Sequence, residues 1–278
     1  MTDIMTEDNF NNLLKHKSDS IRKDVVETAV ANGAEHIAPS LSCIDILTVL
    51  YYEIMDVSRT NWEERDRFIL SKGHGCYGLY SILADKGILP AESWKNFHKG
   101  SFLTGCVERY PEYGLEASCG SLGHGLPFAV GIAFGAKLQN KKFKVYCLVG
   151  DGEMQEGTMW EAVQFASKHK LDNLTLIIDN NGLQAMDFTE NVLVKERDRD
   201  HFVKKLEAFG FIAESCNGHD IEEMKSILSD RRELSGIPKA LIANTIKGYG
   251  LLCMENIPKF HFRMPSKAEL EMGNRYEL

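Results

Sequence analysis

The sequence lacks an excess of basic residues: 32 Lys and Arg stand against 40 Asp and Glu, a formal net charge of −8 over 278 residues. A nucleic-acid binder would present a basic face, so we expect no nucleic-acid partner. Long hydrophobic runs are also missing, because the longest weakly interrupted apolar stretch, residues 126–136, is too short to cross a bilayer. The first residues, MTDIMTEDNF, are acidic where a signal peptide is basic and then apolar. We therefore expect a cytoplasmic protein that is neither secreted nor membrane-bound.

Cysteine pairs at metal-binding spacing and linker segments are absent as well. The seven cysteines are odd in number and no two stand at CxxC spacing, so neither a disulfide framework nor a zinc site is indicated. The seven prolines are scattered, and no repeat or low-complexity tract divides the chain. We predict a single domain over residues 1–278, which includes an N-terminal helical segment of about residues 1–35.

Apolar residues recur at helical spacing in several segments and form short continuous runs between them. The segments predicted as helices are 8–31, one starting at Ser40, 125–137, 157–169 and one near 220–234. The runs predicted as strands are 68–70, 145–149, 174–178 and 240–243. Nearly continuous apolar strands separated by helices indicate an α/β fold, a doubly wound, mostly parallel sheet with helices on both faces. In such a sheet, ligands bind beyond the carboxyl ends of the strands.

Polar, glycine-containing motifs stand at the predicted carboxyl ends of two strands. Gly150-Asp151-Gly152 follows one strand and Asn180-Asn181 follows the next. A carboxylate and a side-chain amide suit a hard cation such as Mg²⁺, and the glycines let a pyrophosphate approach the backbone. Either motif alone is more typical of a turn. The spacing of 30 residues between the aspartate and the second asparagine, which spans one helix and one strand, favours a joint metal and diphosphate site.

These two motifs resemble the signature of thiamine-diphosphate enzymes, GDG followed somewhat under thirty residues later by NN. The stretch GDGEMQEGTMWEA is similar to the transketolase version of that signature. Other stretches that resemble transketolase segments, in the family's order, are GAEHIAPSLSCIDIL, RDRFILSKGHGCYGLY, CGSLGHGLPFAVGIAFGAKL, NGHDIEEMKSIL and ALIANTIKGYGLLCMENIPKFH. On this resemblance the chain is identified as the N-terminal, pyrophosphate-binding part of a transketolase-like enzyme, with the thiamine-diphosphate-binding fold.

The resemblance implies two cofactors, thiamine diphosphate and Mg²⁺ (or Ca²⁺ or Mn²⁺), and the residues that hold them. The metal ligands would be the side chains of Asp151 and Asn181 and the backbone carbonyl of Leu183. The residues in contact with the organic cofactor would be Gly120, Ser121 and Leu122 along its rings, Gly152 and His74 at its diphosphate, and His261 at its reactive carbon.

Other roles that the resemblance implies belong to histidines and glutamates. His36 and His261 match histidines that face the sugar donor and the cofactor, which makes them the expected catalytic residues. Histidines polarise oxyanions and move protons near neutral pH. Glu156 and Glu161 match acidic residues that join paired active sites across a subunit interface, although both could simply be exposed helix residues. For His219 we expect only that it stabilises its own Gly-His-Asp turn.

Two positions depart from the family pattern. Where many relatives read PGHP, this chain reads Thr104-Gly105-Cys106-Val107, so that Cys106 replaces a histidine that hydrogen-bonds the donor sugar. His124 stands where a glutamine is common. Because a thiol is a weak hydrogen-bond donor, we expect a specialised donor or acceptor rather than ordinary ketose-phosphate chemistry.

The resemblance also indicates which half of the catalytic machinery lies elsewhere. Thiamine-diphosphate enzymes need a glutamate on a second, pyrimidine-binding domain, and no such domain follows within these 278 residues. We therefore predict a split enzyme, an α2β2 heterotetramer in which a separate C-terminal transketolase subunit supplies the catalytic glutamate. The predicted reaction transfers a two-carbon ketol unit from a ketose-type donor, a small sugar, to an aldehyde acceptor.

Two alternatives stay open at this point. The chain could belong to a 2-oxoacid-using thiamine-diphosphate enzyme, such as a decarboxylating dehydrogenase or a relative of deoxyxylulose-phosphate synthase, although its KGYG, MEN and FH ending favours transketolase. It could also be a non-catalytic cofactor-binding subunit, against which the intact Asp151 and Asn181 argue. The donor, the acceptor and the pathway do not follow from the sequence.

Overall fold

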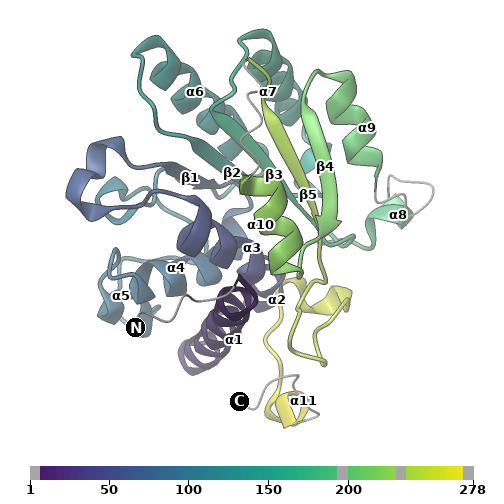
Figure 1. Ribbon diagram of the computed structural model, residues 1–278. Coiled ribbons are helices and arrows are strands. Elements are labelled where there is room, and N and C mark those ends of the chain that lie inside the picture. The colour runs from purple at the N-terminus through teal and green to yellow at the C-terminus, as the bar shows by residue number, and fades with distance from the viewer. Residues whose placement is uncertain (1–6, 193–199, 230–235, 272–278) are drawn as a thin grey trace.

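A parallel sheet forms the centre of the molecule in the computed structural model, which describes residues 7–192, 200–229 and 236–271 (Figure 1). Within those residues the strands are β1 (Arg67–Leu70), β2 (Val145–Gly150), β3 (Leu174–Asn180), β4 (Ile212–Asn217) and β5 (Lys239–Asn244). They stand in the order β1-β2-β3-β5-β4, and every neighbouring pair is parallel. Gly150 pairs with Asp179, and Asn180 with Asn244, so the carboxyl ends of β2, β3 and β5 meet at one edge.

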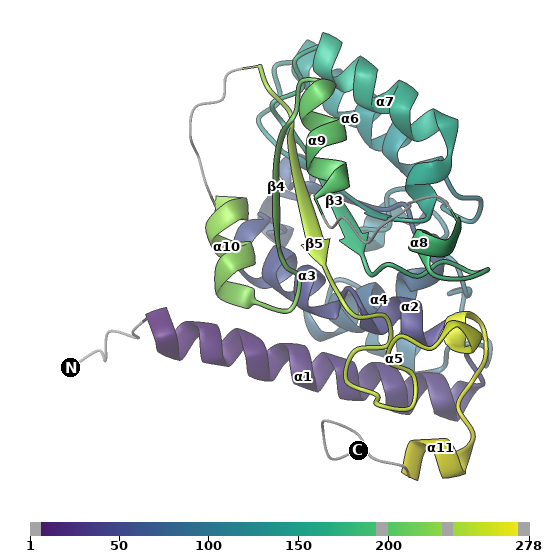
Figure 2. The same cartoon turned by 90° about the vertical axis from the view of Figure 1, so that its right-hand side faces the viewer.

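One face of the sheet carries a thick helical layer. It contains α1 (Glu7–Asn32), α3 (Ile44–Val49), α4 (Cys76–Asp85) and α10 (Ile221–Ser229). Figure 2 shows the long helix α1 running beneath the other helices of this layer, and it packs against α3, α4 and α10. Because successive side chains of a strand point to opposite faces, Phe68, Leu148 and Leu241 belong to the core on this side.

The opposite face is covered by α6 (Gly125–Leu138), α7 (Gly157–Lys168) and α9 (His201–Ala208), which lie together at the top of Figure 1. Ile69, Cys147 and Ile242, the strand neighbours of the residues on the other side, are buried in this second core. In α9 the apolar Phe202 and Leu206 stand four residues apart and are both buried, as expected of an amphipathic helix. Helices on both faces of a parallel sheet confirm the expected α/β fold class.

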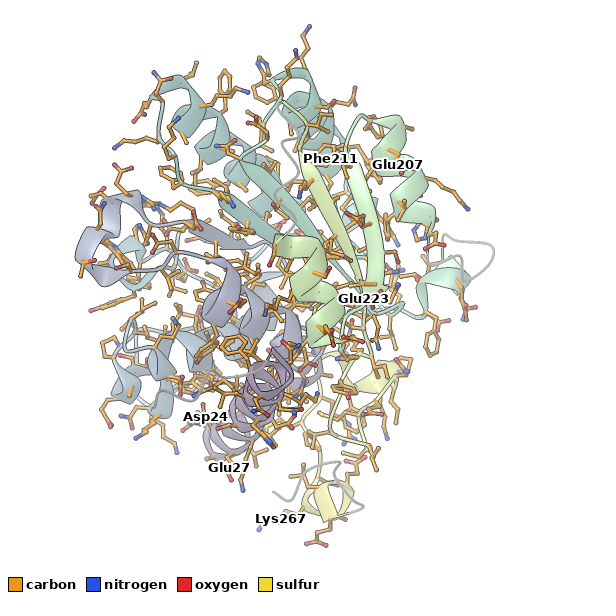
Figure 3. All side chains as sticks on the ribbon, viewed as in Figure 1. Asp24, Glu27, Glu207, Phe211, Glu223 and Lys267 are labelled. Atoms are coloured by element: carbon orange, nitrogen blue, oxygen red, sulfur yellow. The ribbon has the colours of Figure 1, made fainter. Side chains whose placement is uncertain are left out.

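Short elements complete the described chain. The short α-helices are α2 (Ile37–Leu41), α5 (Ala91–Lys95), α8 (Thr189–Val192) and α11 (Lys267–Glu271). Single turns of π- or 3₁₀-helix cover Leu50–Ile54, Arg59–Glu64, Gly73–Gly75, Pro111–Tyr113, Glu153–Gln155 and Pro258–His261. Polar bonds join some of these pieces: Asp24 on α1 (Figure 3) accepts hydrogen bonds from the Ser81 hydroxyl and from the Trp94 indole N–H, the latter at 2.7 Å. In the described ranges, no helix is both long and apolar enough to span a membrane.

Most expected elements are present within a few residues of their predicted bounds, but the prediction omits α4, α9 and β4, and one expected helix is wrong. The strand β4 is not among the predicted strands, because it is an edge strand whose Glu214 and Ser215 are polar and half-buried, so that no apolar run marks it. The helix expected to start at Ser40 is instead two helices. Ser40 lies inside α2, and the chain leaves helical geometry at Cys43 (φ −105°, ψ 6°) before α3 begins. Of the helix expected near 220–234, residues 230–234 lie outside the described chain.

Candidate active site

A cavity of about 340 Å³ opens at the carboxyl edge of the sheet, where β2, β3 and β5 end. All of the site residues predicted from the sequence except Ser121 line it: His36, His74, Gly120, Leu122, Asp151, Gly152, Asn181, Leu183 and His261. These residues come from segments spread over most of the chain, and the fold brings them to one place. The location agrees with the rule that α/β sheets bind ligands beyond the carboxyl ends of their strands.

The three expected metal ligands lie on the loops that follow β2 and β3. The Gly182 N–H donates a hydrogen bond to Asp151 Oδ2 at 2.5 Å, so this carboxylate joins the two loops. The Leu183 N–H donates to Asn181 Oδ1 at 3.1 Å. Burial, and next the neighbouring Asp179 carboxylate, raise the pKa of Asp151 above its ordinary value. A cation bound here would relieve this unfavourable burial of negative charge.

A second carboxylate, that of Asp179, lies fully buried at the end of β3 behind these loops. It accepts hydrogen bonds from the Ser42 hydroxyl at 2.6 Å, from Asn181 Nδ2 at 3.2 Å, from Lys72 Nζ and from the Thr245 hydroxyl. Burial alone would raise the pKa of Asp179, but the Lys72 ion pair and the hydroxyl donors hold it below its ordinary value. We call Asp179 and these four partners the Asp179 cluster. Because Asn181 Nδ2 points to Asp179, its Oδ1, the atom able to bind a metal, is turned away from that carboxylate.

Three histidines form a triangle on the cavity wall. The ring centroids of His36, His74 and His261 are 5.3 to 6.0 Å apart. Burial lowers the pKa of all three rings, and for His261, where the charge of Lys247 adds to burial, the pKa falls to about 3. Neutral imidazoles both donate and accept hydrogen bonds, so this triangle is suited to bind hydroxyl and carbonyl oxygens and to pass protons between them.

Two buried lysines line the same cavity, and neither is among the residues predicted from the sequence. Lys72 pairs with Asp179. Lys247 Nζ donates to the Leu183 carbonyl at 3.1 Å and lies 2.7 Å from His261 Nδ1. Burial, reinforced by the nearby Lys72 charge, lowers the pKa of Lys247. Both lysines closely follow the carboxyl end of a strand, β1 and β5 respectively, so the strand-end rule could have found them.

The glycine-rich loop that precedes α6 forms another wall of the cavity. Gly120 and Leu122 line it, whereas Ser121 is exposed and does not. The loop is held by the buried Glu153, whose Oε1 accepts a hydrogen bond from the Gly123 N–H at 2.9 Å. The main chain of this loop is therefore fixed by a side chain from the turn after β2.

The two departures from the family pattern lie in different places. Cys106 lines the cavity, and burial raises the pKa of its thiol, which keeps it protonated. His124 is exposed and folds back on its own loop, with Nδ1 3.0 Å from the Leu122 carbonyl oxygen, and it does not line the cavity. Glu156 and Glu161 are both exposed at the start of α7, away from the cavity wall.

The described residues include no group of three or more His, Cys, Asp and Glu side chains that could hold a metal ion unaided. This agrees with the expected ligand set of one carboxylate, one amide and one carbonyl. Such a set leaves coordination positions for other oxygens, as is typical of Mg²⁺ bound together with phosphate groups. The residues present therefore fit a metal that arrives with a diphosphate.

The fold and the cavity define an α/β domain with a ligand site beyond the carboxyl ends of its strands. Residues 15–270 match the family described as "Transketolase, thiamine diphosphate binding domain". The chain belongs to the transketolase family. The match includes the five described strands, the whole cavity wall and both helical layers apart from the first residues of α1.

Named relatives refine this assignment. A protein of Actinobacillus succinogenes, named as one subunit of an apulose-4-phosphate transketolase, is 40% identical over 264 residues, 94% of this chain and 94% of that protein. The 6-deoxy-6-sulfo-D-fructose transketolase subunit SqwG of a Clostridium species is 35% identical over 85% of this chain and 86% of its own length. The solved transketolase of Campylobacter jejuni is 33% identical with a TM-score of 0.80, and this chain spans 91% of itself but 40% of that chain. The expected assignment to a subunit of transketolase type is confirmed by relatives of matching length that are named as subunits.

Proposed function

We propose that this chain is the N-terminal subunit of a split transketolase that depends on thiamine diphosphate and Mg²⁺. The reaction is the transfer of a two-carbon ketol unit from a ketose donor to an aldehyde acceptor. The observation that carries the proposal is that Asp151, Asn181 and Leu183 line one cavity together with a triangle of neutral histidines. The first group suits a metal with a diphosphate, and the second suits a sugar that must exchange protons.

The charges at the cavity support joint binding of metal and diphosphate. Lys72 and Lys247, when protonated, balance Asp151 and Asp179. A divalent cation alone would add uncompensated charge to a buried site, and a diphosphate alone would add negative charge beside two carboxylates. Bound together, the two nearly cancel. We therefore expect that the metal and the cofactor strengthen each other's binding.

The chain's own groups would position the substrate and move its protons. When bound, thiamine diphosphate supplies the nucleophilic carbon and the electron sink that cleavage of a ketose carbon–carbon bond requires. Asp151, Asn181 and Leu183 would hold the metal, and the Gly152 backbone would meet the diphosphate. When Lys247 is protonated, its ammonium can only donate to His261 Nδ1, which leaves the proton of this neutral ring on Nε2. That N–H would be available to a substrate oxygen, with His36 beside it.

The partner in this proposal is a separate C-terminal transketolase subunit that supplies the catalytic glutamate. Support comes from relatives of matching length whose names designate them as one lettered subunit of a transketolase, which implies a further subunit. We propose an α2β2 heterotetramer in the cytoplasm, with Glu156 and Glu161 at the contact between paired active sites. Their exposure at the start of α7 leaves them free for such a contact.

The experiment that tests the proposal is calorimetric titration of the chain with thiamine diphosphate and Mg²⁺. Thiamine without its diphosphate, and thiamine diphosphate in EDTA, are the matched controls. We expect binding only when the metal and the diphosphate are both present. Turnover should require the partner subunit. Metal-independent binding, or full activity of the chain alone, would contradict the proposal.

The donor is the finer question. Two relatives are named for apulose 4-phosphate and for 6-deoxy-6-sulfo-D-fructose, so a donor panel should contain both sugars, xylulose 5-phosphate, and pyruvate for a 2-oxoacid-using alternative. We propose that Cys106 in the cavity contributes to the choice. We expect Cys106→His to raise relative kcat/KM for xylulose 5-phosphate roughly tenfold, because an imidazole donates the hydrogen bond that a thiol makes poorly. Cys253→His, at a half-buried cysteine outside the cavity wall, is the control. An unchanged order of donors in Cys106→His would show that Cys106 does not contribute to the choice of donor.

A further inference from the structure

Outside the cavity, a second buried network surrounds Asp45 on α3. The Asp45 carboxylate is fully buried and accepts hydrogen bonds from Arg22 of α1 at 2.8 Å, from His219 Nδ1 at 2.7 Å and from the Ser18 hydroxyl. We call Asp45 with these three partners the Asp45 cluster. Its Arg22 guanidinium also lies over the Tyr249 ring, 4.9 Å from the centroid. The sequence motifs assign no function to any of these residues except a local turn for His219.

The ring of His219 connects this network to the end of β5. Its Nε2 accepts a hydrogen bond from the Ile246 N–H at 2.9 Å, while its Nδ1 faces Asp45. A backbone N–H can only donate, so Nε2 carries no proton and the ring proton sits on Nδ1, where the carboxylate accepts it. The expectation that His219 stabilises its own turn is wrong for the side chain. The turn is closed by its backbone N–H, which donates to Asn217 Oδ1 at 3.1 Å.

Ile246 lies in the middle of a short segment that runs from β5 into the active site. On one side of it, the Thr245 hydroxyl donates to Asp179. On the other side, Lys247 Nζ donates to the carbonyl of Leu183, an expected metal ligand. The Gly248 N–H then donates to the Ala38 carbonyl in α2 at 3.1 Å. The His219 ring thus holds the backbone immediately before the lysine that faces the cavity.

The loop that carries His219 is itself rigidly placed. The Gly218 N–H donates to the Asn244 carbonyl at 2.8 Å, and a Cβ at Gly218 would lie 2.5 Å from the Thr245 side chain, so this turn packs directly on the end of β5. Glu223 of α10 (Figure 3) accepts a hydrogen bond from the Asn217 N–H at 2.9 Å. The Tyr249 ring stacks on His219 with centroids 3.6 Å apart. The imidazole therefore has one position and two assigned hydrogen bonds.

We propose that His219, held between Asp45 and the Ile246 N–H with its proton on Nδ1, is a positioning residue for Lys247. It fixes the backbone that sets the Lys247 ammonium against Leu183 and His261 in the cofactor cavity. The ring's partners Asp45, Ile246 and Tyr249 do not line the cavity, so its effect on the site passes through the Ile246 backbone. This inference rests on the proposed function for one point only, namely that Lys247 faces the metal and diphosphate.

Two substitutions separate the two bonds of the ring. An asparagine places its amide nitrogen near the position of Nδ1 and keeps the donor to Asp45, but leaves the Ile246 N–H without a partner. A glutamine places its amide oxygen near the position of Nε2 and keeps the acceptor for Ile246, but loses the donor to Asp45. We expect His219→Asn to weaken binding of Mg²⁺ with thiamine diphosphate about tenfold, and His219→Gln to stay within about threefold of the parent chain. A role confined to packing against Asp45 predicts the opposite order.

Measurements without the cofactor test the same geometry. The ¹⁵N chemical shifts of His219 in the full, unsubstituted chain should report a proton on Nδ1 and none on Nε2. The Ile246 amide should exchange with solvent at least about tenfold faster in His219→Asn than in His219→Gln. These readouts remain available even if one variant folds poorly, because the ¹⁵N measurement needs no substitution.

The outcomes separate this inference from the proposed function. A proton on Nε2 in the parent chain, or cofactor binding by His219→Asn equal to that of the parent, would overturn the role given to His219. Lys247→Met provides the reference, since loss of the ammonium should weaken cofactor binding at least as much as His219→Asn. If the parent chain and Lys247→Met bind Mg²⁺ with thiamine diphosphate equally, or neither binds, the proposed function fails at Lys247. The ¹⁵N shifts and the Ile246 exchange then still decide the placement by His219.

Discussion

The Asp45 cluster and the Asp179 cluster are similar in construction and differ in what they face. Each has a fully buried carboxylate, a basic partner within ion-pair distance and at least one hydroxyl donor. In both, burial would raise the pKa of the carboxyl group, but the basic partner (Arg22 or Lys72) and the hydrogen-bond donors together outweigh burial, so that the pKa is lowered.

The difference lies beyond the first partners. Around Asp45 the charges are matched within the cluster, and Tyr249 stacks over His219. The Asp179 cluster instead borders the cavity at the strand ends, and Asp151 and Lys247 also line this cavity. Burial moves the pKa of Asp151 upward and that of Lys247 downward, each toward its uncharged form. A buried network that satisfies its own charges needs no ligand and is costly to break, whereas one that leaves charges in unfavourable burial at a cavity indicates a ligand.

The largest expected effect is a loss of stability when the Asp45 cluster is mutated. Asp45→Asn removes the buried counter-charge of Arg22 and leaves it only the more exposed Asp19 at 3.3 Å, and breaking such a buried pair costs about 3–5 kcal/mol. Urea unfolding measures the loss. Glu27→Gln is the control, because Glu27 is exposed on α1 (Figure 3) and its pair with Lys23 at 3.9 Å should contribute less than about 1 kcal/mol. Equal stabilities for the two variants would erase the distinction between the clusters.

The next largest expected effect is a loss of cofactor binding when Asp151, beside the Asp179 cluster, is mutated. Asp151→Asn should weaken binding of Mg²⁺ with thiamine diphosphate at least about 100-fold, since the loss of a charged metal ligand exceeds that of an outer-shell partner. Its unfolding free energy without cofactor should stay the same or rise, because the buried Asp151 charge is already unfavourable there. Calorimetry measures the dissociation constant of the cofactor, and urea unfolding measures the free energy of unfolding. Asp172→Asn, on a half-exposed aspartate outside the cavity, is the matched control. Tight binding by Asp151→Asn would refute the assigned metal site.

The smallest effect is a pH dependence that the cavity histidines should cause. Burial and the Lys247 charge lower the pKa of His261 from 6.5 to about 3. Between these two pH values the imidazole is protonated in the unfolded chain and neutral in the folded chain. The free energy of unfolding therefore falls as the pH drops below about 6.5. The slope of the unfolding free energy against pH corresponds to the number of protons taken up on unfolding. We expect this number to be smaller in His261→Gln by less than one, because the ring is half-exposed. Unfolding at pH 7, 6 and 5 measures it.

The Asp45 carboxyl group makes no contribution to the slope in the same pH range. The lowered pKa of Asp45 stabilises the fold above its ordinary value of 3.8, and this stability is lost only as the pH falls from there through the lower, folded value. A slope between pH 7 and 5 that is identical in His261→Gln and the parent would show that the buried ring is not the cause.

Much of the candidate site could be found from the sequence because its parts are local. Asp151 and Asn181 follow apolar strand runs, and the strand-end rule places both at one edge. Lys247 is subject to the same rule and begins the KGYG stretch that resembles the family, yet the resemblance assigned it no role. The bond between Asp45 and His219 could not be found, since these residues are 174 positions apart and neither spacing nor composition links them. That residues 1–278 form one domain stays a prediction.

The sequence by itself determined the alternation of helices and strands, the glycine-containing turns and the family. Each of these depends on residues that are neighbours along the chain. Only the tertiary structure decided which charged residues are buried, which tautomer His219 adopts and which of two similar carboxylate networks borders a cavity. Burial and hydrogen-bond partners depend on contacts between distant segments. Ser42, directly after α2, bonds to Asp179 of β3 across 137 positions of sequence. The energy of a charge is set by such long-range neighbours, and they exist only once the chain has folded.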